Sequence, residues 1–345
     1  MVDRTRRSYG ACMCVGALED LRDATRATLA DVVRRSPVAL LDHPHYFNAG
    51  DHLIYSGTPA YLNALGCSVD HVCAPHTYDA ELLEQLVPSG PILLLGGGNF
   101  GDRWPMHQWF RERVVADFPH RRIVQLPQSF DFTDAGALAA TRSIYEEHPD
   151  LTVLVRDREG AERTAEAFPT TAVRFCPDLA FGATVTAPAE PEVDIVVLAR
   201  RDAEAVERPP ALRPDEEQVD WSLGASANAQ WWASAAIEAG VWRLPWLRRR
   251  VHPIARVVMD HRTAMNLDAA CARPGRGRVV VTDRMHGGVL AALLGRPVFL
   301  VDNVNKKVSA IVRDYLGTLP DVELATDFAD AMARARSRVG RGRAT

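Results

Sequence analysis

The chain has 345 residues, of which 47% are hydrophobic and 24% are charged, a composition typical of globular proteins. A formal charge of −4 argues against a protein whose main partner is nucleic acid, because such proteins carry a net basic surface. No apolar run approaches the roughly 20 residues that a membrane-spanning helix needs, so we expect no transmembrane segment. Arginines near the N-terminus precede a weakly apolar stretch, but charged residues follow it without a cleavage site, so we expect a cytoplasmic protein.

Short apolar runs alternate with amphipathic segments along most of the chain, a pattern typical of parallel α/β sheets. The strands that we expect are 38–41, 69–73, 91–95, 122–126, 152–155, 173–176, 194–199, 279–282 and 298–301. The helices that we expect are 18–35, 51–65, 80–87, 106–117, 133–147, 158–168, 225–239, 255–272, 286–294, 306–316 and 327–339. A proline-containing hinge at 186–191 interrupts the pattern. We therefore predict an α/β protein with two doubly wound, Rossmann-like domains, an N-terminal domain of residues 1–187 and a C-terminal domain of residues 188–345.

The segment 241–257 carries three consecutive arginines between tryptophans and prolines. We interpret it as an irregular, solvated connection in preference to a helix on a membrane surface.

Six cysteines are scattered along the chain without a CxxC pair. Zinc ligands could come from Cys67, His71, Cys73 and His76, but a short strand turns its neighbouring side chains to opposite faces. We therefore interpret the cysteines as small buried thiols of a reducing compartment, and expect neither a metal site nor a cofactor.

Glycines follow the expected strand 91–95 without a break. Gly96, Gly97 and Gly98 are succeeded by Asn99 and, after Gly101, by Asp102. Contiguous glycines match neither the GxGxxG dinucleotide fingerprint nor a P-loop. They either form a tight turn that needs positive φ or let backbone N–H groups approach a ligand, and we favour the ligand.

The strand 38–41 is followed by a polar segment that includes Asn48, Gly50 and Asp51. Asn48 or Asp51 could cap the next helix, whose N-terminus is also a site for anions. The three nearby histidines are expected to be exposed turn residues, one of them facing the ligand.

In the second half, Arg200 follows the strand 194–199, whereas Arg284 and His286 follow the strand 279–282. Ligands of open α/β sheets bind beyond the carboxyl ends of strands. Two arginines with a histidine at a helix start therefore predict a cradle for phosphate or carboxylate, because guanidinium groups bind such oxygens bidentately. Singly, each residue would more simply be a cap or a surface group.

Taken in order, these motifs resemble the polysaccharide pyruvyl transferase family. The motifs that carry the resemblance are 48–51, 96–104, 126–129, 156–159, 177–181 and 282–287. One departure is Gly160, where the family often has a serine.

The resemblance implies a fold similar to GT-B glycosyltransferases, with two Rossmann-like halves facing a cleft. It implies phosphoenolpyruvate as donor and a diol of a saccharide, or of a lipid-linked saccharide, as acceptor, giving a cyclic pyruvate ketal and phosphate. Arg284, His286 and Gly287 would then hold the donor with Arg200 as a companion, while the residues of the first half, including Arg156 and Asp157, would line the acceptor side. A homo-oligomer is compatible with the sequence.

The residue types suit this chemistry. We hypothesise that His286 protonates or stabilises the phosphate, that the two arginines neutralise it, and that Asp51 is the base toward the acceptor. The alternatives are a GT-B glycosyltransferase that uses a nucleotide sugar and a non-catalytic saccharide-binding protein.

Overall fold

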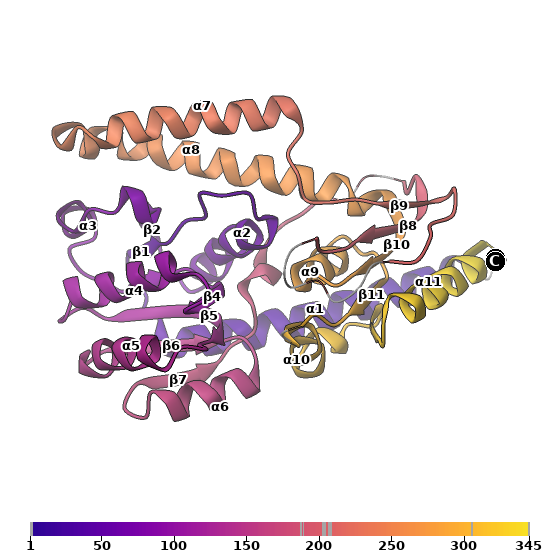
Figure 1. Cartoon of the computed structure of the whole chain (residues 1–345), viewed down its shortest axis with the longest axis horizontal. Coiled ribbons are helices and arrows are strands. Elements are labelled where there is room, and N and C mark those ends of the chain that lie inside the picture. Colours follow the sequence, from indigo (N-terminus) through magenta and orange to yellow (C-terminus); the bar gives the residue numbers. More distant parts are fainter. Residues whose placement is uncertain are drawn as a thin grey trace. The chain divides into compact units, whose positions relative to one another are not determined.

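The computed structural model describes residues 3–186, 188, 190–201, 205, 209–304 and 306–343. The chain forms two compact units. One, here the seven-stranded unit, comprises Ala24–Ala183 and Leu223–Asn266; the other, here the five-stranded unit, comprises Met1–Asp23, Thr184–Ser222 and Leu267–Thr345. Each unit contains one sheet (Figure 1).

The sheet of the seven-stranded unit runs in the order β2-β1-β3-β5-β6-β7, with β4 paired to β5, and every pairing is parallel. Its strands are β1 (Val38–Leu41), β2 (Val69–Cys73), β3 (Ile92–Leu94), β4 (Gly97–Gly101), β5 (Ile123–Asp131), β6 (Leu151–Val155) and β7 (Ala172–Phe175). The helices between them are α2 (Ala49–Ala64), α3 (Ala80–Leu86), α4 (Pro105–Asp117), α5 (Ala135–Glu147) and α6 (Arg158–Ala167), after α1 (Asp3–Val32). Every residue of the inner strands β1, β3 and β6 is buried, and all but Thr152 are apolar, as expected of strands covered on both faces.

The sheet of the five-stranded unit is also all parallel, in the order β12-β11-β10-β8-β9. Its elements are β8 (Val193–Leu198), β9 (Glu216–Gln218), β10 (Gly277–Thr282), α9 (Met285–Leu293), β11 (Val298–Val301), α10 (Lys307–Asp314), β12 (Val322–Ala325) and α11 (Phe328–Arg343). Side chains of β8, β10 and β11 pack against Phe328, Ala331 and Met332 of α11.

These two parallel sheets confirm the predicted α/β class with two Rossmann-like sheets. Strands β9 and β12 were not predicted, because neither is an apolar run: β9 (Glu216–Gln218) is entirely polar, and the two central residues of β12 are exposed. The glycine-rich segment, expected as a loop, is in fact strand β4.

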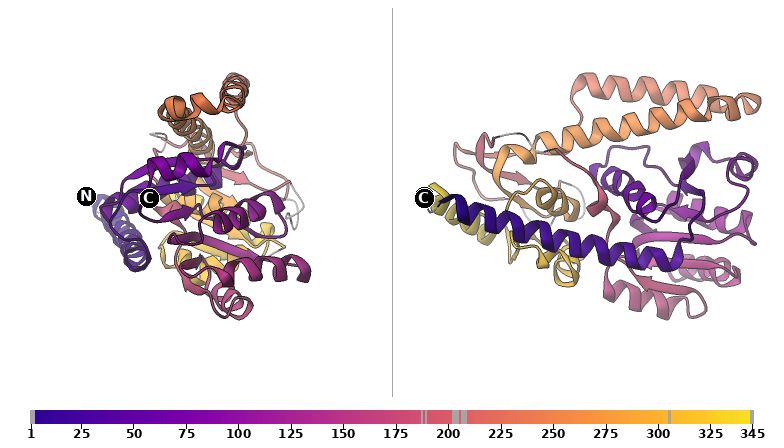
Figure 2. Two further views of the ribbon diagram at one scale, coloured as in Figure 1. Left: turned by 90° about the vertical axis from the view of Figure 1, so that its left-hand side faces the viewer. Right: turned by 180° about the vertical axis from the view of Figure 1, so that it is seen from behind.

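Residues 241–257 are helical except for 243–244, so the prediction of an irregular connection was wrong. They belong to α7 (Ala225–Trp242) and α8 (Pro245–Ala272), which run side by side (Figure 1 and Figure 2). Pro253 lies inside α8, which continues because His252, Met259 and Arg262 bury one of its faces. Among the described residues, no helix is both long and apolar enough to cross a membrane.

Candidate active site

Each sheet has a topological switch point, where two adjacent strands are followed in the chain by strands on opposite sides of the pair. In the seven-stranded unit, β1 leads to β2 on one side and its neighbour β3 leads to β5 on the other. Ligands of open α/β sheets bind at the carboxyl ends of such strand pairs. The candidates Asn48, Asp51 and Gly96–Gly98 follow these two strands.

Asn48 and Asp51 form a hydrogen-bonded group at the start of α2. The Asn48 side chain accepts a hydrogen bond from the N–H of Gly50 at 3.0 Å, which caps the helix. Its Nδ2 donates to Oδ2 of Asp51 at 2.7 Å, and the Tyr46 hydroxyl donates to the same oxygen at 2.9 Å. Two donors and the helix N-terminus stabilise the negative charge of the buried Asp51 carboxylate.

Tyr46 is a donor because it keeps its proton. Burial, together with the neighbouring carboxylate of Asp51, raises the pKa of Tyr46 well above its usual value. The sequence did not single out Tyr46, although it lies five positions before Asp51, in the loop that precedes α2.

The glycines of β4 divide into two groups. A Cβ on Gly101 would lie 2.0 Å from the carbonyl oxygen of Asp131, and one on Gly96, the residue before β4, would lie 2.6 Å from that of Pro127, so these two are required for packing. A Cβ on Gly97 (φ 148°) would lie 3.2 Å from Oδ1 of Asp51, and one on Gly98 would lie 3.3 Å from the guanidinium of Arg156. Gly97 and Gly98 therefore border the charged candidate residues.

Asn99 is held by a fully buried arginine. Arg111 donates to the backbone oxygen of Asn99 at 2.8 Å and also to its side chain, and it pairs with Asp42 at 2.9 Å. Gln128 supports the segment from β5, because it donates to the carbonyl of Leu95 and accepts from the N–H of Asn99. These contacts fix the path of the glycine segment.

Asp102 anchors the loop that follows β5. It accepts hydrogen bonds from the backbone N–H groups of Thr133, at 2.9 Å, and Asp134. Although desolvation opposes the charged form, these N–H groups lower the pKa of Asp102.

Arg156 follows β6 and is buried. It donates to Oγ of Ser129 at 2.8 Å and forms an ion pair with Asp178 at 2.7 Å. Asp157 caps α6 by accepting from the N–H of Gly160 at 2.6 Å. A Cβ on Gly160 would lie 2.7 Å from Asp157, so a serine here would displace this cap.

The expectation of exposed histidines was wrong for His43 and His52, which are 1% and 0% exposed, whereas His45 is exposed. Nε2 of His52 lies 3.1 Å from the carbonyl oxygen of Tyr46, which can only accept, so this nitrogen carries the proton. Its Nδ1 then accepts from the Thr263 hydroxyl at 3.0 Å, and Nε2 of His43 donates to the same hydroxyl at 3.2 Å. These hydrogen bonds join α8 to α2 and to the loop that precedes it.

Burial keeps these histidines neutral. It lowers the pKa of His43 well below the usual value and that of His52 to about 4. A second pair, His71 and His252, joins β2 to α8 at 3.0 Å, and burial lowers the pKa of His71 to about 3. His71 is thus engaged with another histidine, and Cys67, Cys73, Cys176 and Cys271 are buried thiols, as expected. The side chains of Cys12 and Cys14 lie outside the described part.

In the five-stranded unit the switch point lies between β8 and β10, which lead to β9 and β11 on opposite sides. Arg200 follows β8, and Arg284 and His286 follow β10, so the predicted cationic residues lie at this switch point. The N–H of Arg200 donates to Oδ1 of Asp283 at 2.8 Å and joins the two strand ends. Burial raises the pKa of Asp283, a second residue that the sequence analysis did not single out.

Arg284 is positioned by the segment after β9. Its guanidinium pairs with Asp220 at 3.0 Å and stacks over the ring of Trp221 at 5.5 Å. The sequence did not predict β9, so it also could not predict that the residues after β9 contact Arg284. His286 lies in the first turn of α9, where N–H groups point toward anions. Gly287 lets α9 approach the sheet, since a Cβ there would lie 2.7 Å from Oγ1 of Thr282.

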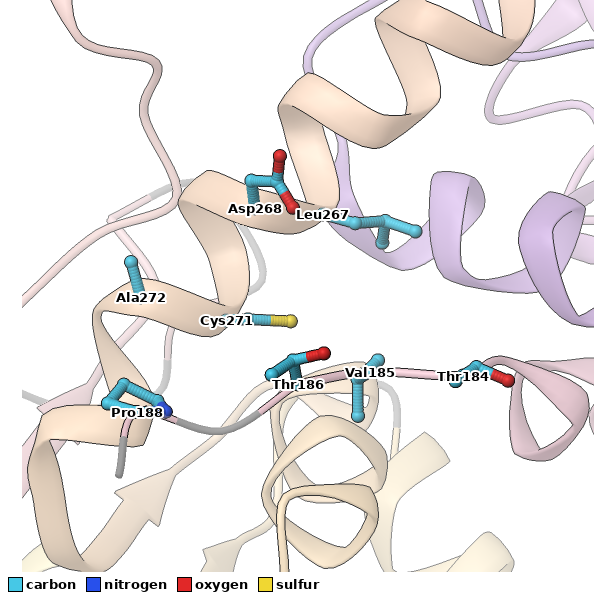
Figure 3. Close-up of a pocket in the computed structure, with 8 residues that line it drawn as sticks. All are labelled: Thr184, Val185, Thr186, Pro188, Leu267, Asp268, Cys271 and Ala272. Carbon is cyan, nitrogen blue, oxygen red and sulfur yellow. The ribbon is translucent and has the colours of Figure 1, made fainter. Parts of the chain in front are cut away.

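A pocket elsewhere in this unit is lined by Thr184, Val185, Thr186, Pro188, Leu267, Asp268, Cys271 and Ala272 (Figure 3). It contains none of the candidate residues. Within the described ranges, no cluster of three or more histidine, cysteine or acidic side chains could hold a metal ion.

Comparison with known proteins gives a family match. The family profile described as "Polysaccharide pyruvyl transferase" matches residues 48–305, which include every candidate residue. The putative pyruvyl transferase EpsO of Bacillus subtilis (strain 168) is 28% identical over 303 residues, 86% of this chain and 91% of that protein. Pyruvyl transferase 1 of Schizosaccharomyces pombe is 31% identical over 284 residues, 77% of this chain and 66% of that protein.

A solved structure is similar in fold. The crystal structure of a functionally uncharacterized protein from Klebsiella pneumoniae superposes with a TM-score of 0.55 and 13% identity, covering 89% of this chain and 99% of that one.

Proposed function

The chain belongs to the polysaccharide pyruvyl transferase family, and from this we propose that it transfers the pyruvate unit of phosphoenolpyruvate to two hydroxyls of a saccharide. The products are a cyclic ketal and inorganic phosphate. The observation that carries the proposal is the placement of Arg284 and His286 at the carboxyl end of β10, beside Arg200 at the end of β8.

The donor requires positive charge, because phosphoenolpyruvate carries both a phosphate and a carboxylate. In this proposal Arg284 and Arg200 bind these groups, and the N-terminus of α9 faces the phosphate. The Asp220 carboxylate, which is partly exposed, holds Arg284 in place until the more highly charged donor competes for its guanidinium.

The acceptor requires a base. In this proposal Asp51 takes a hydroxyl proton, with Tyr46 and Asn48 orienting its carboxylate. Gly97 and Gly98 leave space for the sugar beside Asp51 and Arg156.

The reaction balances without a cofactor. One proton adds to the methylene carbon of the donor and makes it a methyl group, which leaves C2 electrophilic. The two hydroxyl oxygens bond to C2 and the bond from C2 to the phosphate oxygen breaks. The diol loses two protons in the reaction. One balances the proton that was added to the methylene carbon, and the other ends on the departing phosphate, to which His286 delivers it.

Thermal unfolding with phosphoenolpyruvate tests the donor assignment. Ligand at 100 times its Kd stabilises a protein by about 2.7 kcal/mol, which a melting curve resolves. We expect this shift in the wild type and its loss in Arg284→Ala. Arg278→Ala is the matched control, because Arg278 is an exposed arginine of β10, the strand that precedes Arg284.

Phosphate release with a panel of saccharides tests the transfer itself. His286→Gln should keep the thermal shift but lose about 10²–10³ in turnover. A thermal shift with nucleotide sugars but not with phosphoenolpyruvate would instead support glycosyl transfer, and turnover near wild type in the variant would refute the role of His286.

A further inference from the structure

Helix α7 presents an uncharged face to solvent. Its only ionisable residue is Glu238, which is buried and pairs with Arg262 of α8 at 2.5 Å. Among the side chains of α7 that the structure describes, the exposed ones are all uncharged. They are Trp232, which is 62% exposed, the polar Ser226, Asn228 and Gln230, and the alanines Ala225, Ala229, Ala233, Ala236 and Ala239. Surface helices ordinarily carry charged residues on this face, so the outer face of α7 is unusual for a helix in contact with water alone.

Helix α8 continues this apolar surface. Trp246, Ile254 and Val257 are 69%, 64% and 67% exposed. At about 100° per residue these positions fall within about a third of the helix circumference, opposite the buried His252 and Met259. These three side chains form an apolar stripe on α8, and Trp232 of the neighbouring α7 is a further exposed apolar side chain. Clustered exposed apolar side chains mark a site of interaction.

The same region is strongly cationic, although the chain as a whole is acidic. Residues 241–257 contain five arginines and no acidic residue, against a formal charge of −4 for the protein. Arg243 lies between the two helices and Arg250 lies on the exposed side of α8, four residues after Trp246. The charge of the hairpin is therefore complementary to an anionic surface.

We propose that the α7–α8 hairpin docks this protein on an anionic lipid surface. Tryptophan and aliphatic side chains of the stripe enter the boundary between headgroups and acyl chains, while the arginines bind lipid phosphates. This is the arrangement of helices that lie in the membrane interface, and it requires no spanning helix. The proposal does not depend on the proposed function, because it involves neither donor nor acceptor.

Vesicle co-sedimentation of the full-length protein tests the proposal. The probes are vesicles of phosphatidylcholine alone and of phosphatidylcholine mixed with phosphatidylglycerol. We expect binding to the mixed vesicles, little to the neutral ones, and weakening by added salt. Arg243→Gln/Arg250→Gln should weaken binding about 25-fold, from roughly fivefold per arginine. Ile254→Ser/Val257→Ser should weaken it about tenfold or more.

Trp109→Ser is the matched control. Trp109 is 62% exposed in the same unit, on α4, so it tests whether any exposed aromatic residue suffices. It should bind as the wild type does, and all variants should retain the wild-type melting temperature.

Three results would overturn the proposal. They are no binding to the mixed vesicles, equal binding by the hairpin variants, and equal weakening by Trp109→Ser. A fourth result would also overturn it: if the protein is an oligomer in lipid-free solution and Ile254→Ser/Val257→Ser converts it to a monomer, the apolar face binds a second copy of the chain.

Discussion

The hydroxyl of Tyr46 donates a hydrogen bond to Oδ2 of Asp51 across 2.9 Å, from a side chain on the loop that precedes α2. Asn48 donates to the same oxygen, so one carboxylate oxygen is fixed by two donors. The arrangement determines how Asp51 is oriented at the switch point of the seven-stranded sheet.

Removing the hydroxyl should impair catalysis more than binding. A hydrogen bond to a charged group contributes about 1.5–3 kcal/mol, so Tyr46→Phe should lower kcat in the phosphate-release assay by about tenfold or more. The thermal shift with phosphoenolpyruvate should not change. Tyr78→Phe is the control, because Tyr78 makes the same kind of bond to Asp117 at 2.8 Å in the same unit. Equal loss of kcat in both variants would exclude a specific role for Tyr46.

The glycines of β4 should respond differently to alanine. Gly101 has φ 146° and no room for a Cβ, so Gly101→Ala should reduce the free energy of unfolding by about 3 kcal/mol or more in urea titrations. Gly98→Ala meets only the end of the flexible Arg156 side chain and should cost about 1 kcal/mol or less. Its effect should appear in KM for the acceptor. Similar destabilisation by both substitutions would contradict this division.

The positions of the strands could be predicted from the sequence where a segment was apolar and bounded by turn residues. The strand at Val298–Val301 agrees to the residue, and Asn48, Asp51, Arg200 and Arg284 all follow the strands expected of them. These features depend on local periodicity and on the general rule for parallel sheets.

The contacts that orient the candidate residues could not be predicted in this way. Asp220 lies 64 residues from Arg284, and Thr263 lies 211 residues from His52. Such pairs depend on tertiary packing and leave no periodic signal. The helicity of 245–257 was obscured by its prolines and arginines, because burial of one face of α8 outweighs its weak local propensity.

The buried histidines predict a loss of stability in mild acid. The folded-state pKa of His52 is about 4, and burial lowers those of His43 and His71 as well, whereas an unfolded histidine titrates near its ordinary value of 6.5. Below that value the unfolded state binds more protons, so stability is present above about pH 6.5 and falls as the pH drops toward 4. Each histidine contributes up to about 1.4 kcal/mol per pH unit.

Urea titrations between pH 7 and pH 5 measure this slope. His52→Gln should be less stable than the wild type at pH 7 but should show a shallower slope, since one titrating group is gone. A slope unchanged in His52→Gln would show that other groups cause the acid sensitivity.

The buried ion pair of Asp42 and Arg111 stabilises the fold, and Arg111 also positions Asn99 of the glycine segment. Asp42 adopts φ 71°, which asparagine tolerates, so Asp42→Asn removes the charge with little change to the backbone. The fully buried Arg111 would then lose its counterion, and we expect a loss of about 3–5 kcal/mol in the free energy of unfolding. Asp150→Asn is the control, because the ion pair of Asp150 with Arg122 is partly exposed to solvent, so this substitution should cost less than about 1 kcal/mol.

Replacing both partners, in Asp42→Asn/Arg111→Met, should recover part of the stability, since no buried charge remains. It should not recover turnover, because Arg111 also holds Asn99 and with it the glycine segment. Recovery of both together would mean that Arg111 acts only through the ion pair.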